Sequence, residues 1–110
     1  MFILISEYLK SAADVDLQLE NHRSWIQLGY ESGRILFSGR LVPGTGGAIV
    51  LRADSRNEVV DLIQTDPYVQ HNLVRYAVHE VSETAFPHRS QAFDDFMNAA
   101  SDDALSASDA

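Results

Sequence analysis

The chain has no cysteine, little glycine or proline, and only eight basic residues. Without cysteine, disulfide bridges, thiolate nucleophiles and cysteine-ligated zinc are excluded, and the lack of disulfides fits a cytoplasmic protein. Sixteen Asp and Glu residues against eight Lys and Arg give a formal net charge of −8. Because the summed field of such a chain repels phosphates, we expect neither nucleic acid nor an anionic membrane surface as a partner.

Long apolar runs are also lacking. The opening segment, "MFILISEYLK", is apolar for only five residues before Ser6 and Glu7. A membrane span needs about 20 apolar residues, and a signal peptide needs a basic region followed by a longer apolar stretch. We therefore expect no membrane partner, and a mature protein that begins at Met1 with a strand.

Length and composition allow one modest core. The chain has 110 residues, of which 45% are hydrophobic, and this is enough for a single domain. A change of composition after Pro87 predicts a domain over residues 1–84 and a tail over residues 85–110.

The tail itself has two parts. The segment "SQAFDDFMNAA" predicts a short amphipathic helix within residues 89–100 that presents Phe93, Phe96 and Met97. This apolar stripe can dock on the protein's own body or on a partner. The acidic end, "SDDALSASDA", has the small, polar composition of a disordered segment.

Residue patterns in the body predict the order strand, helix, strand, twice over. The expected strands cover residues 1–9, 34–42, 47–53 and 73–83, and the expected helices cover residues 11–34 and 54–65. Ser11 offers a cap for the first helix and Ser32-Gly33 offer its stop, where glycine can adopt a left-handed conformation, and Asp54 or Ser55 offers a cap for the second helix. This β-α-β-β-α-β order is the ferredoxin-like α+β pattern, a four-stranded antiparallel sheet with two helices on one face.

The strand segments "FILIS", "ILF" and "AIVL" are apolar on both sides of the pleat. A sheet with one face in water would instead alternate apolar and polar residues. Two helices cover only one face of a four-stranded sheet, so the open face needs another cover. The simplest cover is a second copy of the chain, and we expect a homodimer that packs sheet to sheet.

The first helix carries a histidine at an unexpected position. Val15, Leu19, Ile26 and Tyr30 recur at helical spacing, which predicts a stripe that faces the core. His22 falls on this stripe, where leucine would be the usual residue. It is either a core histidine with a satisfied hydrogen bond or a group that transfers protons. Trp25 and Leu28 fall off the stripe, and we expect them to pack against the tail or a partner.

The opening strand and four further segments carry a resemblance to a known family. These segments are "NHRSW", "GRILFSGRL", "TGGAIVLRADS" and "TDPYV". Over residues 1–81 the chain resembles YCII-related (YciI-like) domains. The resemblance implies a ferredoxin-like fold that dimerises as an α+β barrel. It also implies a catalytic dyad of the first-helix histidine and the aspartate of an Asp-Pro-aromatic corner, the positions that His22 and Asp66 hold here.

The chain departs from the family pattern at two places. The family usually has Pro after the glycine of its second strand, where this chain has Gly39-Arg40. It usually has Ala-Gly after the Asp-Pro corner, where this chain has His71-Asn72. Asn72 can adopt the left-handed conformation that a glycine would supply. We expect Arg40 and His71 to alter what the pocket accepts.

Helix geometry permits a contact between His22 and Asp66. At ~1.5 Å per residue, about 12 Å of the first helix separates Asp14 from His22. About 13 Å of the second helix, which runs antiparallel to the first, precedes Asp66. His22 and Asp66 are therefore both expected near mid-height of the sheet. An imidazole can take and return a proton near neutral pH, and a carboxylate on its other nitrogen fixes its tautomer. An alternative role for Asp66 is to cap a helical turn that has Pro67 as its first residue.

The predicted chemistry is therefore proton transfer on a small molecule. Ser38 could donate to a substrate oxygen, Gly39 could let a ligand approach the backbone, and Arg40 and Tyr68 are further candidate binding residues. No serine lies in a G-x-S-x-G context, which favours isomerisation or elimination over acyl transfer. The family resemblance adds dehydrohalogenation to the expected reaction types.

We expect neither a cofactor nor a metal, since His71 and His79 lack the spacing of a ligand pair. Two alternatives to an enzyme remain open. One is a non-catalytic ligand-binding or regulatory module that uses the same pocket. The other is an interaction protein whose tail docks elsewhere.

Overall fold

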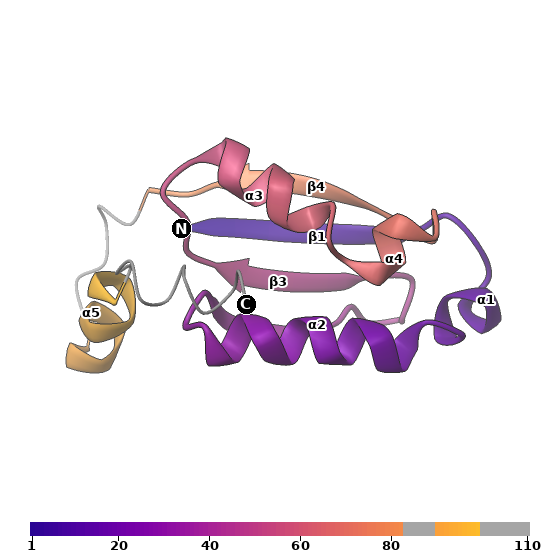
Figure 1. Ribbon diagram of the computed structural model, residues 1–110, viewed down its shortest axis with the longest axis horizontal. Coiled ribbons are helices and arrows are strands. Elements are labelled where there is room, and N and C mark those ends of the chain that lie inside the picture. The colour runs from indigo at the N-terminus through magenta and orange to yellow at the C-terminus, as the bar shows by residue number, and fades with distance from the viewer. Residues whose placement is uncertain (83–89, 100–110) are drawn as a thin grey trace.

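The computed structural model describes residues 1–82 and 90–99 and has the predicted ferredoxin-like α+β fold (Figure 1). Its elements are β1 (Phe2–Tyr8), α1 (Ala12–Asp16), α2 (Leu19–Glu31), β2 (Ile35–Arg40), β3 (Gly47–Leu51), α3 (Arg56–Ile63), α4 (Pro67–Gln70), β4 (Val74–Glu80) and α5 (Gln91–Asn98). The strands form one antiparallel sheet in the order β2-β3-β1-β4. Helices α2, α3 and α4 lie over the same face of it. Within the described ranges, no helix has the length and apolar character needed to cross a membrane.

The segment predicted as one helix over residues 11–34 forms two helices. Ser11 caps α1, because its hydroxyl accepts the N–H of Asp14 at 3.1 Å. The last turn of this helix is of the tighter 3₁₀ type, since the N–H groups of Leu17 and Gln18 bond to carbonyls only three residues earlier. Such bonds end an α-helix. Leu17 is 79% exposed at this break, and α2 begins directly after it.

The remaining helix boundaries follow the local sequence signals. Gly33, with φ of 74°, lies just beyond the end of α2, where a left-handed residue was expected. Of the two caps proposed for the second long helix, Ser55 is the one used, since its hydroxyl accepts the N–H of Glu58 at 3.2 Å. Asn72 has φ of 57°, so it adopts the left-handed conformation in place of glycine.

The core lies between the sheet and the helices. Its largest cluster contains Phe2, Leu4, Ile35, Ile49, Leu51, Val59 and Ile63. Trp25 packs against this cluster, and its indole N–H donates to the hydroxyl of Thr65 at 2.8 Å. The expectation that Trp25 faces the tail or a partner is therefore wrong, because the hydrogen bond to Thr65 draws the indole toward α3. Leu28 is exposed.

The second face of the sheet carries apolar side chains of its own. In β1, Phe2 and Leu4 are buried beneath the helices, while Ile3 and Ile5 alternate with them and are only partly buried. Ile5 pairs with Ala48 of β3 and with Ala77 of β4, so small apolar residues flank it. Phe37 of β2 pairs with Val50 of β3 and is 54% exposed.

The tail helix α5 lies near the end of the sheet where β1 begins (Figure 1). The buried guanidinium of Arg52 donates to the carbonyl of Ala99 at 2.7 Å, and its central carbon lies 5.5 Å from the centre of the Phe96 ring. A helix within residues 89–100 is thus present, and Phe96 contacts the protein's own body. The domain boundary near residue 84 and the expected disordered end lie outside the described residues.

Candidate functional site

The central feature of the site is a hydrogen bond between α2 and the start of α4. Nδ1 of His22 lies 2.8 Å from Oδ1 of Asp66. The Asp66 side chain is 0% exposed, and that of His22 is 17% exposed. An ionised carboxylate can only accept hydrogen bonds, so Nδ1 carries the proton and, in the neutral ring, Nε2 keeps a lone pair.

Two further donors hold the Asp66 carboxylate. Oδ1 also accepts the backbone N–H of Tyr68 at 3.0 Å, which makes Asp66 the cap of α4. Oδ2 accepts the Tyr76 hydroxyl of β4 at 2.6 Å. Burial, and then the charge and hydrogen bond of Asp66, raise the pKa of Tyr76 far above its usual value, so this hydroxyl stays protonated and donates. Capping α4 and holding the imidazole are therefore simultaneous tasks of one carboxylate.

Aromatic rings fix the plane of the imidazole. The Tyr68 ring stacks on that of His22, with ring centres 3.9 Å apart and planes 5° from parallel. The Trp25 ring is tilted by 33°, at a centre distance of 5.8 Å. Chiefly through burial, the pKa of Tyr68 rises to about 12, so its hydroxyl is neutral at physiological pH. His22 is therefore restrained both by a hydrogen bond and by stacking.

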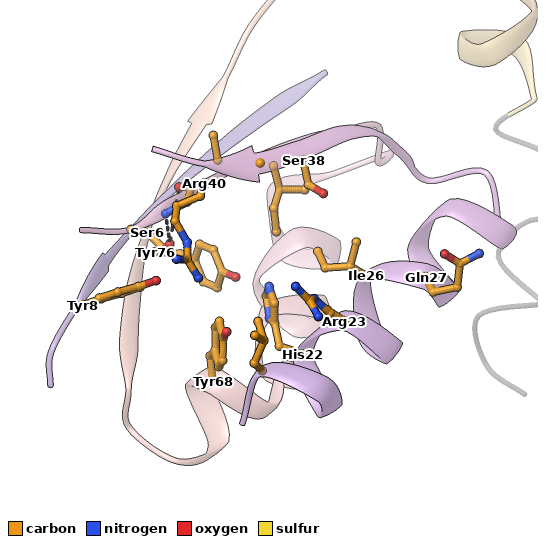
Figure 2. Close-up of a pocket in the computed structure, with 16 residues that line it drawn as sticks. Ser6, Tyr8, His22, Arg23, Ile26, Gln27, Ser38, Arg40, Tyr68 and Tyr76 are labelled. Carbon is orange, nitrogen blue, oxygen red and sulfur yellow. Dashed lines mark hydrogen bonds between the residues drawn. The ribbon is translucent and has the colours of Figure 1, made fainter. Parts of the chain in front are cut away.

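The ring of His22 reaches into a pocket of about 510 Å³ between α2 and the sheet (Figure 2). Residues of β1, β2, β3, α4 and β4 complete its wall. Among its lining residues are His22, Tyr68, Tyr76, Ser38, Gly39 and Arg40. The dyad thus lies at the wall of a cavity that can admit a small molecule.

The family model of the YCII-related domain matches residues 1–83. The chain belongs to this family. Among solved structures, it is similar to 5-chloro-2-hydroxyhydroquinone dehydrochlorinase (TftG) from Burkholderia phenoliruptrix AC1100, a structure in complex with 2,5-dihydroxybenzoquinone. The TM-score is 0.57 and the sequence identity is 17%, and the match covers 74% of this chain and 94% of that chain. The similarity shows a shared fold. No curated protein matches the sequence.

All four predicted binding residues of this YCII-related chain line the pocket. The Ser38 hydroxyl is 2.8 Å from the Tyr30 hydroxyl, so it already has one partner. Gly39 contributes backbone, and a Cβ added there would meet nothing within 4 Å. Arg40 reaches in from the end of β2 (Figure 2), and Tyr68 stacks on the imidazole. Their role in binding stays a prediction.

His71 does not line this pocket but a separate, shallower hollow with Lys10 and Asp14. The expectation that it shapes what the main pocket accepts is wrong, because α4 ends before it and the chain turns away at Asn72. Arg23 and Tyr76 are lining residues that the sequence argument did not name. Alternation along β4 could have identified Tyr76, since it places a phenol on the core face, where its hydroxyl needs a partner.

The arrangement of this YCII-related site is suited to proton transfer. Two serines line the pocket, and neither is bonded to the imidazole: the Ser38 hydroxyl pairs with that of Tyr30, and the Ser6 hydroxyl pairs with the backbone of Gly47. Neither of them is therefore activated by His22. In the part of the chain that the structure describes, no cluster of three His, Asp or Glu residues could hold a metal ion. The groups that the pocket offers are an imidazole nitrogen with a lone pair, neutral phenols and guanidinium groups.

Proposed function

We propose that this YCII-related protein is an enzyme that performs acid–base chemistry on a small molecule, with His22 as the base and acid and Asp66 as the group that orients it. One observation carries the proposal. A fully buried carboxylate binds Nδ1 of His22 at 2.8 Å, while Nε2 has no hydrogen-bond partner within residues 1–82 and 90–99. A histidine kept only as core filler would not need its second nitrogen at the wall of a pocket.

The reaction would begin with transfer of a proton from a C–H or O–H of the substrate to Nε2. Asp66 stabilises the imidazolium that forms. Return of the proton to another carbon completes an isomerisation. Departure of a halide with its electron pair, as a new double bond forms, completes a dehydrohalogenation.

The comparison with TftG supports a reaction of the elimination class. That protein has a similar fold and is a dehydrochlorinase. Elimination is one of the two outcomes that a proton-transfer pair without a nucleophile can produce. We therefore place chlorinated hydroxyquinols first among the compounds to assay, ahead of ketones and lactones with acidic C–H groups.

The test is turnover by the wild type and by His22→Asn, which keeps a polar side chain but removes the basic nitrogen. Chloride release from 5-chloro-2-hydroxyhydroquinone is measured by ion chromatography, and deuterium uptake from heavy water by the other compounds is measured by NMR. We expect turnover that falls by about 10²–10⁴-fold in the variant. Saturable binding of these compounds without product would instead support the alternative, a non-catalytic ligand-binding or regulatory module.

We also propose that the protein works as a homodimer in which a second copy covers the open sheet face. Ile3, Ile5 and Phe37 give this face an apolar surface in a chain of net charge −8. Burial of such a surface stabilises association. A dimer of this kind would form the α+β barrel that the family resemblance implies.

A further inference from the structure

We infer that the pocket binds small, ring-shaped molecules that carry a negatively charged oxygen, and that Arg40 recognises this oxygen. The inference deepens the proposed function, because it names the chemical class of substrate for the same site. It also holds for a ligand that is bound without turnover.

The first argument is the charge of the pocket wall. Two arginines, Arg23 and Arg40, line the pocket, and none of the lining residues of the described chain is Asp or Glu. The whole chain has twice as many acidic as basic residues, sixteen against eight. Asp66, the nearest carboxylate to the imidazole, is fully buried behind it and is not exposed to the pocket. The pocket is thus a cationic region in an acidic protein, which favours an anion.

The second argument is that the arginine donors are available. Arg40 Nη2 lies 3.8 Å from Asp16 Oδ1, which is longer than a hydrogen bond, and both side chains are more than half exposed. Arg23 shares a single, exposed contact of 3.2 Å with Glu20. Exposed pairs of this kind contribute little to stability. A guanidinium has five N–H groups in a planar fork, so most of these donors remain for a ligand.

The third argument is the shape of the remaining wall. Leu19, Ile26 and Ile49 are apolar, and the rings of Tyr68 and Tyr76 complete the wall. Apolar and aromatic surfaces accept the body of a ring-shaped ligand, while a few polar groups fix its orientation.

Arg40 and His22 reach from β2 and α2 toward the same space (Figure 2). A ligand oxygen at Arg40 therefore leaves the body of the ligand within reach of the imidazole. Negative charge that develops on this oxygen during proton transfer would be stabilised by the guanidinium.

Binding can be measured with Trp25, the single tryptophan of the chain, whose ring centre lies 5.8 Å from that of His22. Quenching of its fluorescence is titrated with 2,5-dihydroxybenzoquinone, an ionised enolate at neutral pH, and with 4-hydroxybenzoate. The matched neutral probe is 4-hydroxybenzamide. At least one ionised probe should bind about tenfold or more tightly than the amide. Tighter binding of the benzoquinone would indicate an enolate ligand, and tighter binding of the benzoate would indicate a carboxylate ligand.

The variant Arg40→Gln should weaken binding of the ionised probe by about ten- to a hundredfold, the effect of a lost hydrogen bond to a charged group, and leave the amide unaffected. The control is Lys10→Gln, which removes the same charge at an exposed position outside this pocket. It should change neither affinity. Circular dichroism checks that both variants are folded.

The inference is overturned if the amide binds as tightly as the ionised probes. Equal weakening by Lys10→Gln and Arg40→Gln, or no quenching by any ionised probe at millimolar concentration, would also overturn it. Its failure is distinct from failure of the proposed function. His22→Asn should still bind the anion while turnover is lost, whereas unchanged turnover in that variant refutes the catalytic role and leaves the anion site intact.

Discussion

Asp66 and His22 are 44 positions apart in the sequence, and Asp66 Oδ1 lies 2.8 Å from His22 Nδ1. The same oxygen accepts the backbone N–H of Tyr68. The carboxylate that orients the imidazole is therefore fixed by the helix that it caps. This coupling makes the orientation of His22 a property of the fold as well as of one side-chain rotamer.

The first prediction concerns His22→Leu. Leucine suits an apolar stripe, so a mere core filler would tolerate it or gain stability. In this structure the change leaves a fully buried carboxylate with one donor fewer, and we expect the free energy of unfolding to fall by about 1–3 kcal/mol. Urea denaturation measures the change, with Asn21→Leu at an exposed position of α2 as the control. A more stable His22→Leu protein would contradict the account.

The second prediction concerns Tyr76→Phe. This change keeps the ring but removes the hydroxyl that donates to Oδ2 of Asp66 at 2.6 Å. The buried oxygen loses its partner, so we expect a loss of about 1–3 kcal/mol in unfolding free energy. Tyr30→Phe is the matched control, since the Tyr30 hydroxyl bonds to Ser38 at an exposed site. Equal losses in the two variants would show that the hydrogen bond to Asp66 contributes no more to stability than the exposed bond between Tyr30 and Ser38.

The third prediction concerns alkaline pH. In the folded protein the pKa of Tyr68 is about 12, compared with an ordinary value of 10.0, because burial disfavours the phenolate. The unfolded chain therefore releases this proton first. The stability contributed by neutral Tyr68 is complete below pH 10 and is lost as the pH rises toward 12. The pKa of Tyr76 is also raised, again chiefly by burial, so Tyr76 contributes in the same direction.

Unfolding midpoints measured between pH 8 and 12 check this expectation. Tyr68→Phe, which retains the ring that stacks on His22, should show a shallower decline than the wild type. A wild type and variant with parallel curves would contradict a raised pKa at Tyr68.

The fourth prediction concerns the homodimer. Phe37→Glu places a charge on the open sheet face, where Phe37 is 54% exposed. If a second copy covers this face, sedimentation should show a dimeric wild type and a monomeric variant. Leu17→Glu, at the exposed break between α1 and α2, should leave the dimer intact. A monomeric wild type at micromolar concentration would refute the dimer.

Local signals predicted most of this fold. Hydroxyl caps at Ser11 and Ser55 and a glycine stop at Gly33 define helix ends through bonds within a few residues. Predictions failed where the position of a side chain depends on a partner far away in the sequence. Trp25 turns toward Thr65, 40 positions away, and nothing near Trp25 in the sequence specifies that hydrogen bond.

The site shows the same division. A general role for His22 could be proposed from its place on the apolar stripe, and Asp66 from the family motif. The hydroxyl of Tyr76 on Asp66 and the place of Arg23 in the pocket wall depend on how α2, α4 and β4 meet. Val15, just before the break between α1 and α2, is fully buried in a cluster with Tyr68, Leu73 and Val74, and these partners lie far from it in the sequence.

The most direct test of the central claim is the tautomer of His22, read from the ring nitrogens by ¹⁵N-resolved NMR. The claim is that Asp66 holds the proton on Nδ1, so that Nε2 of the neutral ring is the base. The account predicts an Nδ1–H tautomer in the wild type and its loss or weakening in Asp66→Asn. A neutral ring protonated at Nε2 in the wild type would contradict the account, because the nitrogen assigned to accept the substrate proton would already carry one.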